Sequence, residues 1–325
     1  MSTNDQPMSN KHTGVIIVRV QNSNPNGDLD TNQPRIFDDT QKGWISNVAA
    51  KRRIIRDPLV DNDSLVLEHL KEKFGISEEN YRIFESRMRG YEDISELEAM
   101  KKVENEFKQN PNQTLKTYFD ARLCGTTLLQ QNKTATTGKA LRFVRTGCLQ
   151  MTVGESVGPV NLTTAGISRS APFEKDKLRA GTDDNPSDDD NANISLAHDA
   201  VKMVNYGVYV IKYYISPNMA RKTLATDLDV EVLKQLIPLG FQESRSTLRN
   251  DVSVIAAFHA THGSKLGTFP EWRFTDACHP TLKPDVEDPK SDDDVIFPTL
   301  EQVKQEMLRY NCTIEELLSK FYGLL

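Results

Sequence analysis

Short apolar runs separated by long polar segments are the main pattern along this chain. The run at residues 15–20 (VIIVRV) predicts a strand over about 13–21 that is buried on at least one face. Residues 207–215 (GVYVIKYYI) are rich in β-branched and aromatic residues and predict a second strong strand. A further strand is predicted within 140–153, and residues 252–258 fit either a strand or a helix. These predicted strands lie far apart in the sequence.

The segments between the strands predict helices. Residues 65–108 are charged and rich in helix-favouring types, and residues 115–129 have apolar positions near helical spacing. Residues 226–239 have acidic residues near their start, as helices often do, and helical sequence resumes at 299 and runs to 325. This order of elements predicts an α+β fold with a modified RNA-recognition-motif (ferredoxin-like) core, elaborated by insertions.

The most informative segment is the polar loop at 22–44 with the helix predicted at about 45–57. The loop contains the turn-forming sequence NPNG at 24–27. The helix contains four basic residues: Lys51, Arg52, Arg53 and Arg56. At about 100° per residue, Arg52, Arg53 and Arg56 share one side of an α-helix. Amides and guanidinium groups around one groove suit a phosphate backbone, whereas a basic helix that stands alone is more often only a solvated surface.

Charge composition limits the kind of nucleic-acid contact. The 325 residues include 46 Asp and Glu against 40 Lys and Arg, a formal net charge of −6. A protein coated by nucleic acid over its whole surface needs a basic domain, so this balance argues against such a coat. Acidic residues concentrate at 183–190 and 285–294, while basic residues cluster at 51–56 and more loosely at 133–145. The distribution favours one local basic groove.

Other compositional features set the expected class and compartment. No segment approaches the roughly 20 apolar residues that span a bilayer, and the first residues lack a signal-peptide pattern, so we expect a soluble cytoplasmic protein. The cysteines are scattered: Cys124, Cys148, Cys278 and Cys312. Without CxxC spacing they indicate neither a disulfide framework nor a zinc site. We expect no metal and no cofactor.

Five segments in collinear order resemble one known family. They are NPNGD at 24–28 with Pro34, Arg35, Gly43 and VAAKRRIIRD at 48–57; YFDARLCG at 118–125; VGPVNLTTAGISRSAP at 157–172; NYGVYVIKYYISPNMARKT at 205–223 with LDVEVLKQLI at 228–237; and RSTLRNDVSVIAAFHATHGSKLG at 245–267. Together they are similar to the backbone subunit of type I CRISPR effector (Cascade) complexes. This is the Cas-seven family of the repeat-associated RNA-binding superfamily, and the likeness is closest to its I-C and I-B branch.

The resemblance implies a palm, a helical fingers insertion and a protruding thumb hairpin. The palm is implied to consist of three separate segments, at 13–57, 115–166 and 205–275. The fingers insertion is 58–114 and the thumb is 167–204, while 1–12 is expected to be disordered and 276–325 to form an acidic linker and a helix. The acidic tract at 183–193 departs from what an RNA-facing thumb requires, and nothing beyond about 280 resembles the family.

The resemblance also implies a function in antiviral defence without catalysis. Copies bind a guide (CRISPR) RNA, stack head to tail along its spacer beside other subunits, and leave its bases free to pair with target DNA. The RNA-binding residues implied are Asn24, Asn26, Gly27, Asn47, Lys51, Arg52, Arg56, Arg122, Arg169, Ser170 and Lys202. Contacts to phosphates give affinity without sequence preference, as a protein that accepts any guide requires.

Two other functions remain open from the sequence. Related subunits of type III complexes cut RNA with a loop Asp, and Asp28, Asp30, Asp38 and Asp39 lie in the corresponding loop, although Asp in turns is more often a local hydrogen-bonding residue. The other alternative is an assembly protein that needs no RNA. His259 and His262 are interpreted as structural. TTGKA at 136–140 follows Lys133 where a P-loop needs its first Gly, which excludes a nucleotide-hydrolysis site.

Overall fold

The computed structural model describes residues 7–28, 33–60, 64–86, 95–129, 142–167 and 199–323. Its central feature is an antiparallel sheet with a continuous row of six strands. In spatial order these are β12 (Cys312–Glu316), β9 (Val252–His262), β1 (His12–Ser23), β8 (Asp199–Ile215), β6 (Gly154–Pro159) and β2 (Lys42–Ile45). Two further strands, β5 (Leu149–Met151) and β7 (Leu162–Ile167), also pair with β8.

Four strands of this sheet have the ferredoxin-like arrangement. Along the chain, β1 is followed by α1 (Asn47–Lys51), then by β6 and β8, then by α8 (Asp227–Leu236) and β9. Their spatial order is β9-β1-β8-β6, and each neighbouring pair is antiparallel. A β-α-β-β-α-β order with the first and third strands adjacent in the centre is that of the RNA-recognition motif. The predicted α+β fold and its core are therefore confirmed.

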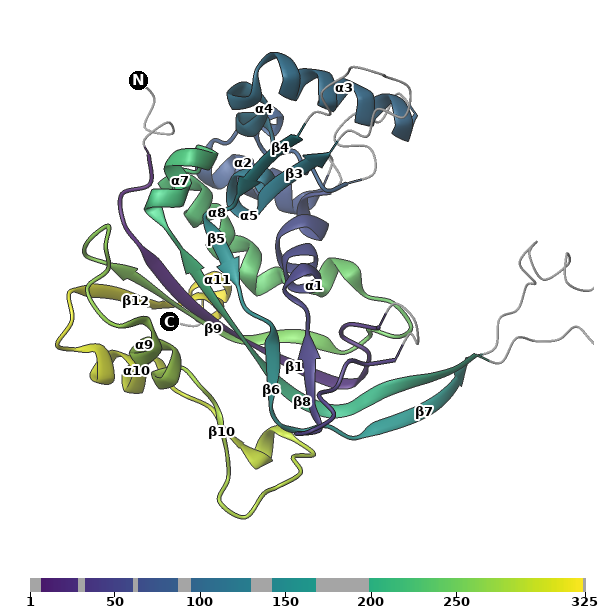
Figure 1. Ribbon diagram of the computed structural model, residues 1–325. Coiled ribbons are helices and arrows are strands. Elements are labelled where there is room, and N and C mark those ends of the chain that lie inside the picture. Colours follow the sequence, from purple (N-terminus) through teal and green to yellow (C-terminus); the bar gives the residue numbers. More distant parts are fainter. Residues whose placement is uncertain are drawn as a thin grey trace, which may run out of the picture.

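Both faces of the sheet are buried. The sequence predicted burial of at least one face of the first strand. On β1, Ile16 and Val18 pack with α1 and α8 in one core, while Val15 and Ile17 pack in a second core. The second core includes residues of α9 (Glu271–Ala277) and α10 (Leu300–Met307). Such burial explains why residues 15–18 are apolar without alternation, since side chains on both faces avoid water. Figure 1 shows α9 and α10 beside the sheet.

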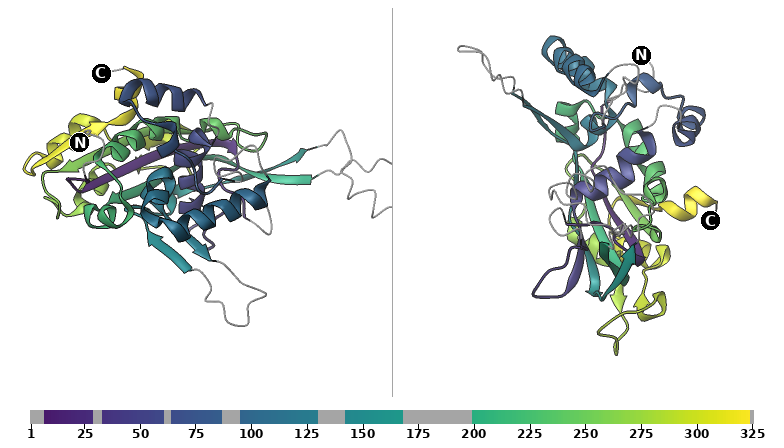
Figure 2. Two further views of the ribbon diagram at one scale, coloured as in Figure 1. Left: turned by 90° about the horizontal axis from the view of Figure 1, so that it is seen from above. Right: turned by 90° about the vertical axis from the view of Figure 1, so that its right-hand side faces the viewer.

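Further helices and a small hairpin complete the described structure. The helices are α2 (Leu65–Phe74), α3 (Glu96–Gln109), α4 (Pro111–Thr117), α5 (Phe119–Cys124), α7 (Pro217–Thr223) and α11 (Leu317–Tyr322); the hairpin pairs β3 (Gly125–Leu129) with β4 (Arg142–Thr146). The paired strands β7 and β8 extend away from the sheet (Figures 1 and 2). No helix among the described residues is long and apolar enough to cross a membrane.

Several expectations about single elements need correction. The C-terminal helix ends at Met307, and the chain then adds β12 to the edge of β9 before α11. Residues 115–129 divide into helix and strand at Gly125, whose φ of 85° ends α5. Residues 7–12 are not disordered: Met8 is buried, and Ser9 Oγ donates to Asp227 at 2.8 Å. Residues 1–6 lie outside the described ranges.

Three histidines join β1 to β9 inside the sheet. His12 Nδ1 lies 3.0 Å from His259 Nε2, and His259 Nδ1 lies 2.7 Å from the hydroxyl of Tyr213. His262 Nδ1 accepts from the backbone N–H of Thr268 at 2.9 Å, so the proton of the neutral ring is on Nε2. The structural interpretation of His259 and His262 agrees with this burial.

Burial lowers the pKa of His12 and of His262 from 6.5 to about 4, and that of His259 well below its usual value. The folded protein therefore keeps these rings neutral at a pH where the unfolded chain protonates them. The contribution of these neutral rings to the unfolding free energy is fully present above pH 6.5. It falls as the pH decreases toward 4, by up to about 1.4 kcal/mol per pH unit for each ring.

We expect His12→Gln to flatten the dependence of the unfolding free energy on pH between 6.5 and 4, measured by urea titration. His69→Gln changes an exposed ring on α2 and is the matched control, with the wild-type slope expected. Equal slopes for wild type and His12→Gln would contradict the assigned role of His12.

Candidate nucleic-acid interface

The loop after β1 is fixed to the helix that follows it. Asn26 Oδ1 accepts from the backbone N–H of Ser46 at 2.6 Å, and Ser46 is the N-cap of α1, accepting from the N–H of Ala49 at 3.1 Å. Within the loop, Gly27 forms a bridge with Pro34. Asn24 is buried, and its backbone N–H donates to the carbonyl of Leu248 at 2.6 Å. The predicted residues Asn24 and Asn26 thus hold the loop in place.

The basic helix changes geometry at its second turn. α1 ends at Lys51, and Arg52–Arg56 is a π-helical turn, with the N–H of Asp57 bonded to the carbonyl of Arg52. In a π-helix the bonded residues are five positions apart. Within this turn Arg53 and Arg52, four and five positions before Asp57, both contact its carboxylate.

The half-buried carboxylate of Asp57 and the buried carboxylate of Asp120 hold the arginines of this turn. Arg53 Nη1 lies 2.7 Å from Asp57, and Arg52 Nε lies 3.4 Å from the same carboxylate. Arg56 Nε donates to Asp120 at 3.0 Å, and the side chain of Asp120 is 0% exposed. The side chain of Arg52 is 65% exposed, so Arg52 offers the largest accessible cationic surface of the three.

Lys51 and Arg56 lie near Cys124, at the end of α5. Burial raises the pKa of Cys124 to about 11, and the charges of Arg56 and Lys51 act in the opposite direction. Among the described residues, Lys51 and Asn47 form no side-chain hydrogen bond or ion pair. Both are half-buried. Their donors are thus available to a ligand.

The remaining predicted residues are less closely grouped. Lys202 is half-buried in β8 opposite Thr164, at the foot of the extending hairpin. Arg169 and Ser170 lie outside the described residues, as does the acidic tract at 183–193. The structure therefore brings together the residues of the first loop and the basic helix. Lys202 is two residues from Val204, which pairs with Ser23 at the end of β1.

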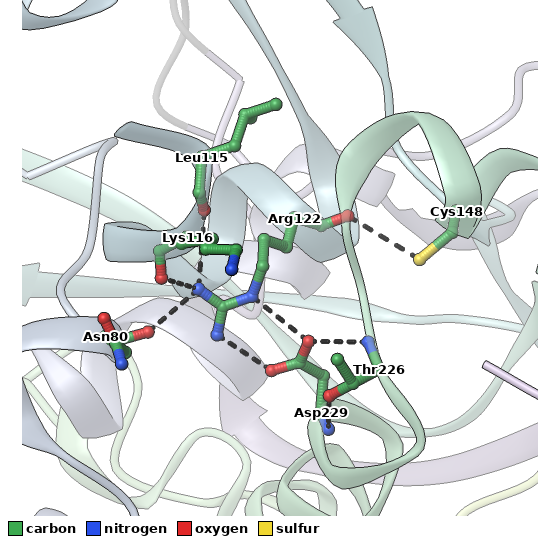
Figure 3. Close-up of polar contacts among 7 residues, drawn as sticks. All are labelled: Asn80, Leu115, Lys116, Arg122, Cys148, Thr226 and Asp229. Carbon is green, nitrogen blue, oxygen red and sulfur yellow. Dashed lines mark hydrogen bonds and ion pairs between the residues drawn. The ribbon is translucent and has the colours of Figure 1, made fainter. Parts of the chain in front are cut away.

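Arg122 does not line a surface groove, and that prediction is corrected. Its Nε and Nη2 donate to the two oxygens of Asp229 at 3.1 and 2.8 Å, and Nη1 donates to the carbonyl of Asn80 at 2.9 Å (Figure 3). Nη1 also donates to the carbonyls of Leu115 and Lys116. The side chains of Arg122 and Asp229 are only 6% and 1% exposed. Burial opposes the charge, but Asp229 outweighs it and raises the pKa of Arg122.

The broad face of the sheet is also closed to RNA. In an RNA-recognition motif the four-stranded sheet stacks bases on its aromatic side chains. Here β8 presents Tyr206 to the second core, where it is 4% exposed and its hydroxyl donates to Asp292 at 2.9 Å. Because α9, α10 and the residues near 292 cover this face, its aromatic side chains are not accessible for stacking with bases.

The described acidic residues of the first loop are Asp28, Asp38 and Asp39. Asp28 lies 3.8 Å from Arg35, and the carboxylate of Asp39 accepts from the N–H of Thr40 at 2.9 Å. Within the described segments of the chain, no group of three or more His, Cys, Asp or Glu is arranged to hold a metal ion. Asp30 lies outside those segments.

Sequence reasoning missed Arg249, which lies near the basic helix. Its pKa is lowered by burial and by the nearby charges of Arg53 and Arg52, while Asp57 acts in the opposite direction. Arg249 belongs to the segment RSTLRN at 245–250, which lies within one of the five family-like segments. Because almost 200 residues separate it from the basic helix, the sequence did not show that the two are close in space.

The chain matches the family model for CRISPR-associated protein Cas7 over residues 10–298. It belongs to the Cas7 family. Two solved chains with similar folds belong to structures titled "CRISPR RNA-guided surveillance complex, pre-nicking" and "CRISPR RNA-guided surveillance complex". The first is 12% identical with a TM-score of 0.39 and covers 77% of this chain and 75% of that one. The second is 12% identical with a TM-score of 0.41 and covers 94% and 88%.

At such low identities and TM-scores, these similarities carry no argument about function. No curated protein matches the chain in sequence. The Cas7 assignment therefore rests on the family model, which confirms the family expected from the five segments but not the I-C and I-B branch.

We expect Arg122→Ala to destabilise this Cas7-family protein by about 3–5 kcal/mol, since it leaves the buried carboxylate of Asp229 without its partner. Urea unfolding measures the loss. Arg221→Ala removes an exposed guanidinium from α7 and is expected to change stability by no more than about 0.5 kcal/mol. Wild-type stability with a selective loss of RNA binding in Arg122→Ala would instead support the surface role.

Proposed function

We propose that this Cas7-family chain is the guide-RNA-binding backbone subunit of a type I CRISPR surveillance complex. The observation that supports it is the rim formed by the loop after β1 and the basic helix. There, Lys51 and Asn47 have no side-chain partner among the described residues, and Arg52 is largely exposed. Ammonium, amide and guanidinium donors of this kind suit phosphate oxygens.

The chemistry of this rim fits a ligand of variable sequence. Ammonium and guanidinium groups recognise the phosphate charge that every nucleotide carries, whereas base edges are read by precisely placed polar groups. Asn26 holds the loop close to the helix, so a sugar-phosphate chain can follow both. Such binding leaves the bases of the guide free to pair with target DNA.

The proposed assembly is head to tail. A contact between two different surfaces of one subunit repeats without closing unless a rotation completes a ring, so the RNA must set the number of copies. In this proposal residues 58–114 are fingers, residues 167–204 are the thumb, and other subunits of the complex join the filament. The protein acts in the prokaryotic cytoplasm as a binding subunit without catalysis.

The first test measures RNA that co-purifies with the full chain from cells that express a CRISPR array. We expect wild type to bring RNA of uniform length, seen in the ratio of absorbance at 260 and 280 nm. Lys51→Gln/Arg52→Gln should lower this ratio. In titrations with single-stranded RNA, it should also reduce the slope of log affinity against log salt by about 1.4, at roughly 0.7 for each lost phosphate contact.

Two outcomes would contradict the proposal. An unchanged salt slope in Lys51→Gln/Arg52→Gln would place the RNA elsewhere. Filaments that form without RNA, and that persist in the double variant, would support the RNA-independent assembly protein. The control Lys304→Gln removes an exposed charge from α10, on the covered face of the sheet, and should keep the wild-type slope.

The alternative of a metal-dependent RNA-cleaving subunit has its own test at Asp28. We expect wild type and Asp28→Asn to leave a labelled target RNA equally intact in the presence of Mg²⁺, as resolved on a denaturing gel. Cleavage by the wild-type complex that disappears in Asp28→Asn would establish the catalytic alternative.

A further inference from the structure

Two arginines share one carboxylate where the basic helix meets the loop before β9, and a third arginine lies near them. Arg52 and Arg53 both contact Asp57, at 3.4 and 2.7 Å. Arg249 approaches from residues 244–251 and is close enough that Arg53, Asp57 and Arg52 all act on its charge. We call these four residues the arginine cluster. Its members come from two segments almost 200 residues apart.

The backbone fixes the two segments against each other. The N–H of Phe241 donates to the carbonyl of Arg53 at 3.2 Å, and Phe241 has a positive φ of 70° that turns the chain at this contact. Arg249 forms a tight bridge with Ser246, and its Nε donates to the carbonyl of Ser244 at 3.3 Å. The guanidinium of Arg249 is therefore oriented by its own loop before any ligand binds.

The arginine cluster has more positive charge than the protein neutralises. Two guanidinium groups contact the single carboxylate of Asp57 and the third lies near it, which leaves a surplus of two positive charges. Among the described residues, the terminal nitrogens of Arg249 and Arg52 have no other partner. The side chains of Arg53 and Asp57 are only 16% and 15% exposed, so solvent screens this repulsion incompletely.

The cluster also borders the loop of the proposed RNA path. The N–H of Asn24 donates to the carbonyl of Leu248 at 2.6 Å, and Ser23 Oγ donates to Asn250 at 2.7 Å. The turn that presents Arg249 thus lies against the loop at 24–28, while Arg53 extends from the helix. A polyanion that follows the loop and the helix meets the arginine cluster between them.

We propose that the arginine cluster binds a phosphate of the RNA backbone, with Arg249 and Arg53 as contact residues and Asp57 as the internal counter-ion that holds Arg52 and Arg53 together in the free protein. The inference rests on the proposed function and adds to it two arginines, Arg53 and Arg249, that the family resemblance did not imply as RNA-binding residues. The lowered pKa of Arg249, caused first by burial and then by Arg53, agrees with a charge that the free protein holds at a cost.

This assignment predicts opposite effects on stability and on binding. Arg249→Gln removes a repelled charge, so the melting temperature should not fall. Its affinity for a labelled mixed-sequence single-stranded RNA should fall, with a salt slope reduced by about 0.7.

Asp57→Asn removes the internal counter-ion, so the melting temperature should fall. The RNA affinity of the folded variant should equal or exceed that of wild type. Fluorescence anisotropy and thermal unfolding of the full chain measure both effects.

Two matched variants make the result specific. Arg249→Lys keeps the charge and should retain the wild-type salt slope, although it loses the planar fork of the guanidinium. Arg309→Gln makes the same charge change at an exposed position just after α10, beside the second core, and should leave both melting temperature and slope unchanged.

The outcomes separate this inference from the proposed function. If wild type binds RNA and Arg249→Gln binds it with equal affinity and slope, the cluster is not a phosphate site and the proposed function stands. If Arg249→Gln melts at a lower temperature with unchanged binding, Arg249 has a structural role. If wild type binds no RNA, alone or in the assembled complex, the proposed function and this inference both fail.

Discussion

The pairing of β1 with β8 on one side and β9 on the other is the constraint on which this structure depends. β1 pairs with β8 from His12 to Ser23 and with β9 from His12 to Val20, so its backbone groups are satisfied inside the protein. Apolar side chains on both faces then require a covering layer on each side. Because β1 ends at Ser23, the same pairing places the loop at 24–28 beside the turn that leads into β9. The rim where we place the RNA is thus a direct result of the register of the sheet.

Buried ion pairs attach the inserted helices to this sheet. Arg122 of α5 and Asp229 of α8 are 107 residues apart in sequence, and Asp120, only two residues before Arg122, binds Arg56 and the backbone N–H groups of Phe84 and Glu85. Replacement by apolar groups is often neutral for stability, so such pairs are better explained by the geometry they enforce. α5 has an acid and a base two residues apart, and each has a matching partner of opposite charge. The helix consequently docks in one orientation, and the basic helix is fixed with it.

Local sequence patterns predicted those regions of the molecule that local forces determine. The apolar runs predicted β1 and β8, and the basic helix was placed correctly, but the predicted loop before it overlaps β2. The patterns did not predict that Arg122 meets Asp229, because a long-range partner leaves no periodic signal near Arg122. The extended C-terminal helix was wrong because β12 satisfies the free edge of β9, which a single segment does not reveal. The π-helical turn was missed since basic side chains at 52, 53 and 56 fit an α-helix equally well.

The chain has a negative net charge, yet its rim is basic. The positions of the individual charges explain how both occur. Screening limits the effect of distant surface carboxylates to about a Debye length, and the carboxylate of Asp292 is already bound by Arg19 and by the hydroxyl of Tyr206. Asp57 and Asp120, in contrast, contact the basic helix directly. Each carboxylate neutralises some of the positive charge of the basic helix, while the arginines of the helix keep further donors. This partial neutralisation limits the binding of weak anions. A polyanion with several phosphates in succession is the ligand that can use the whole rim.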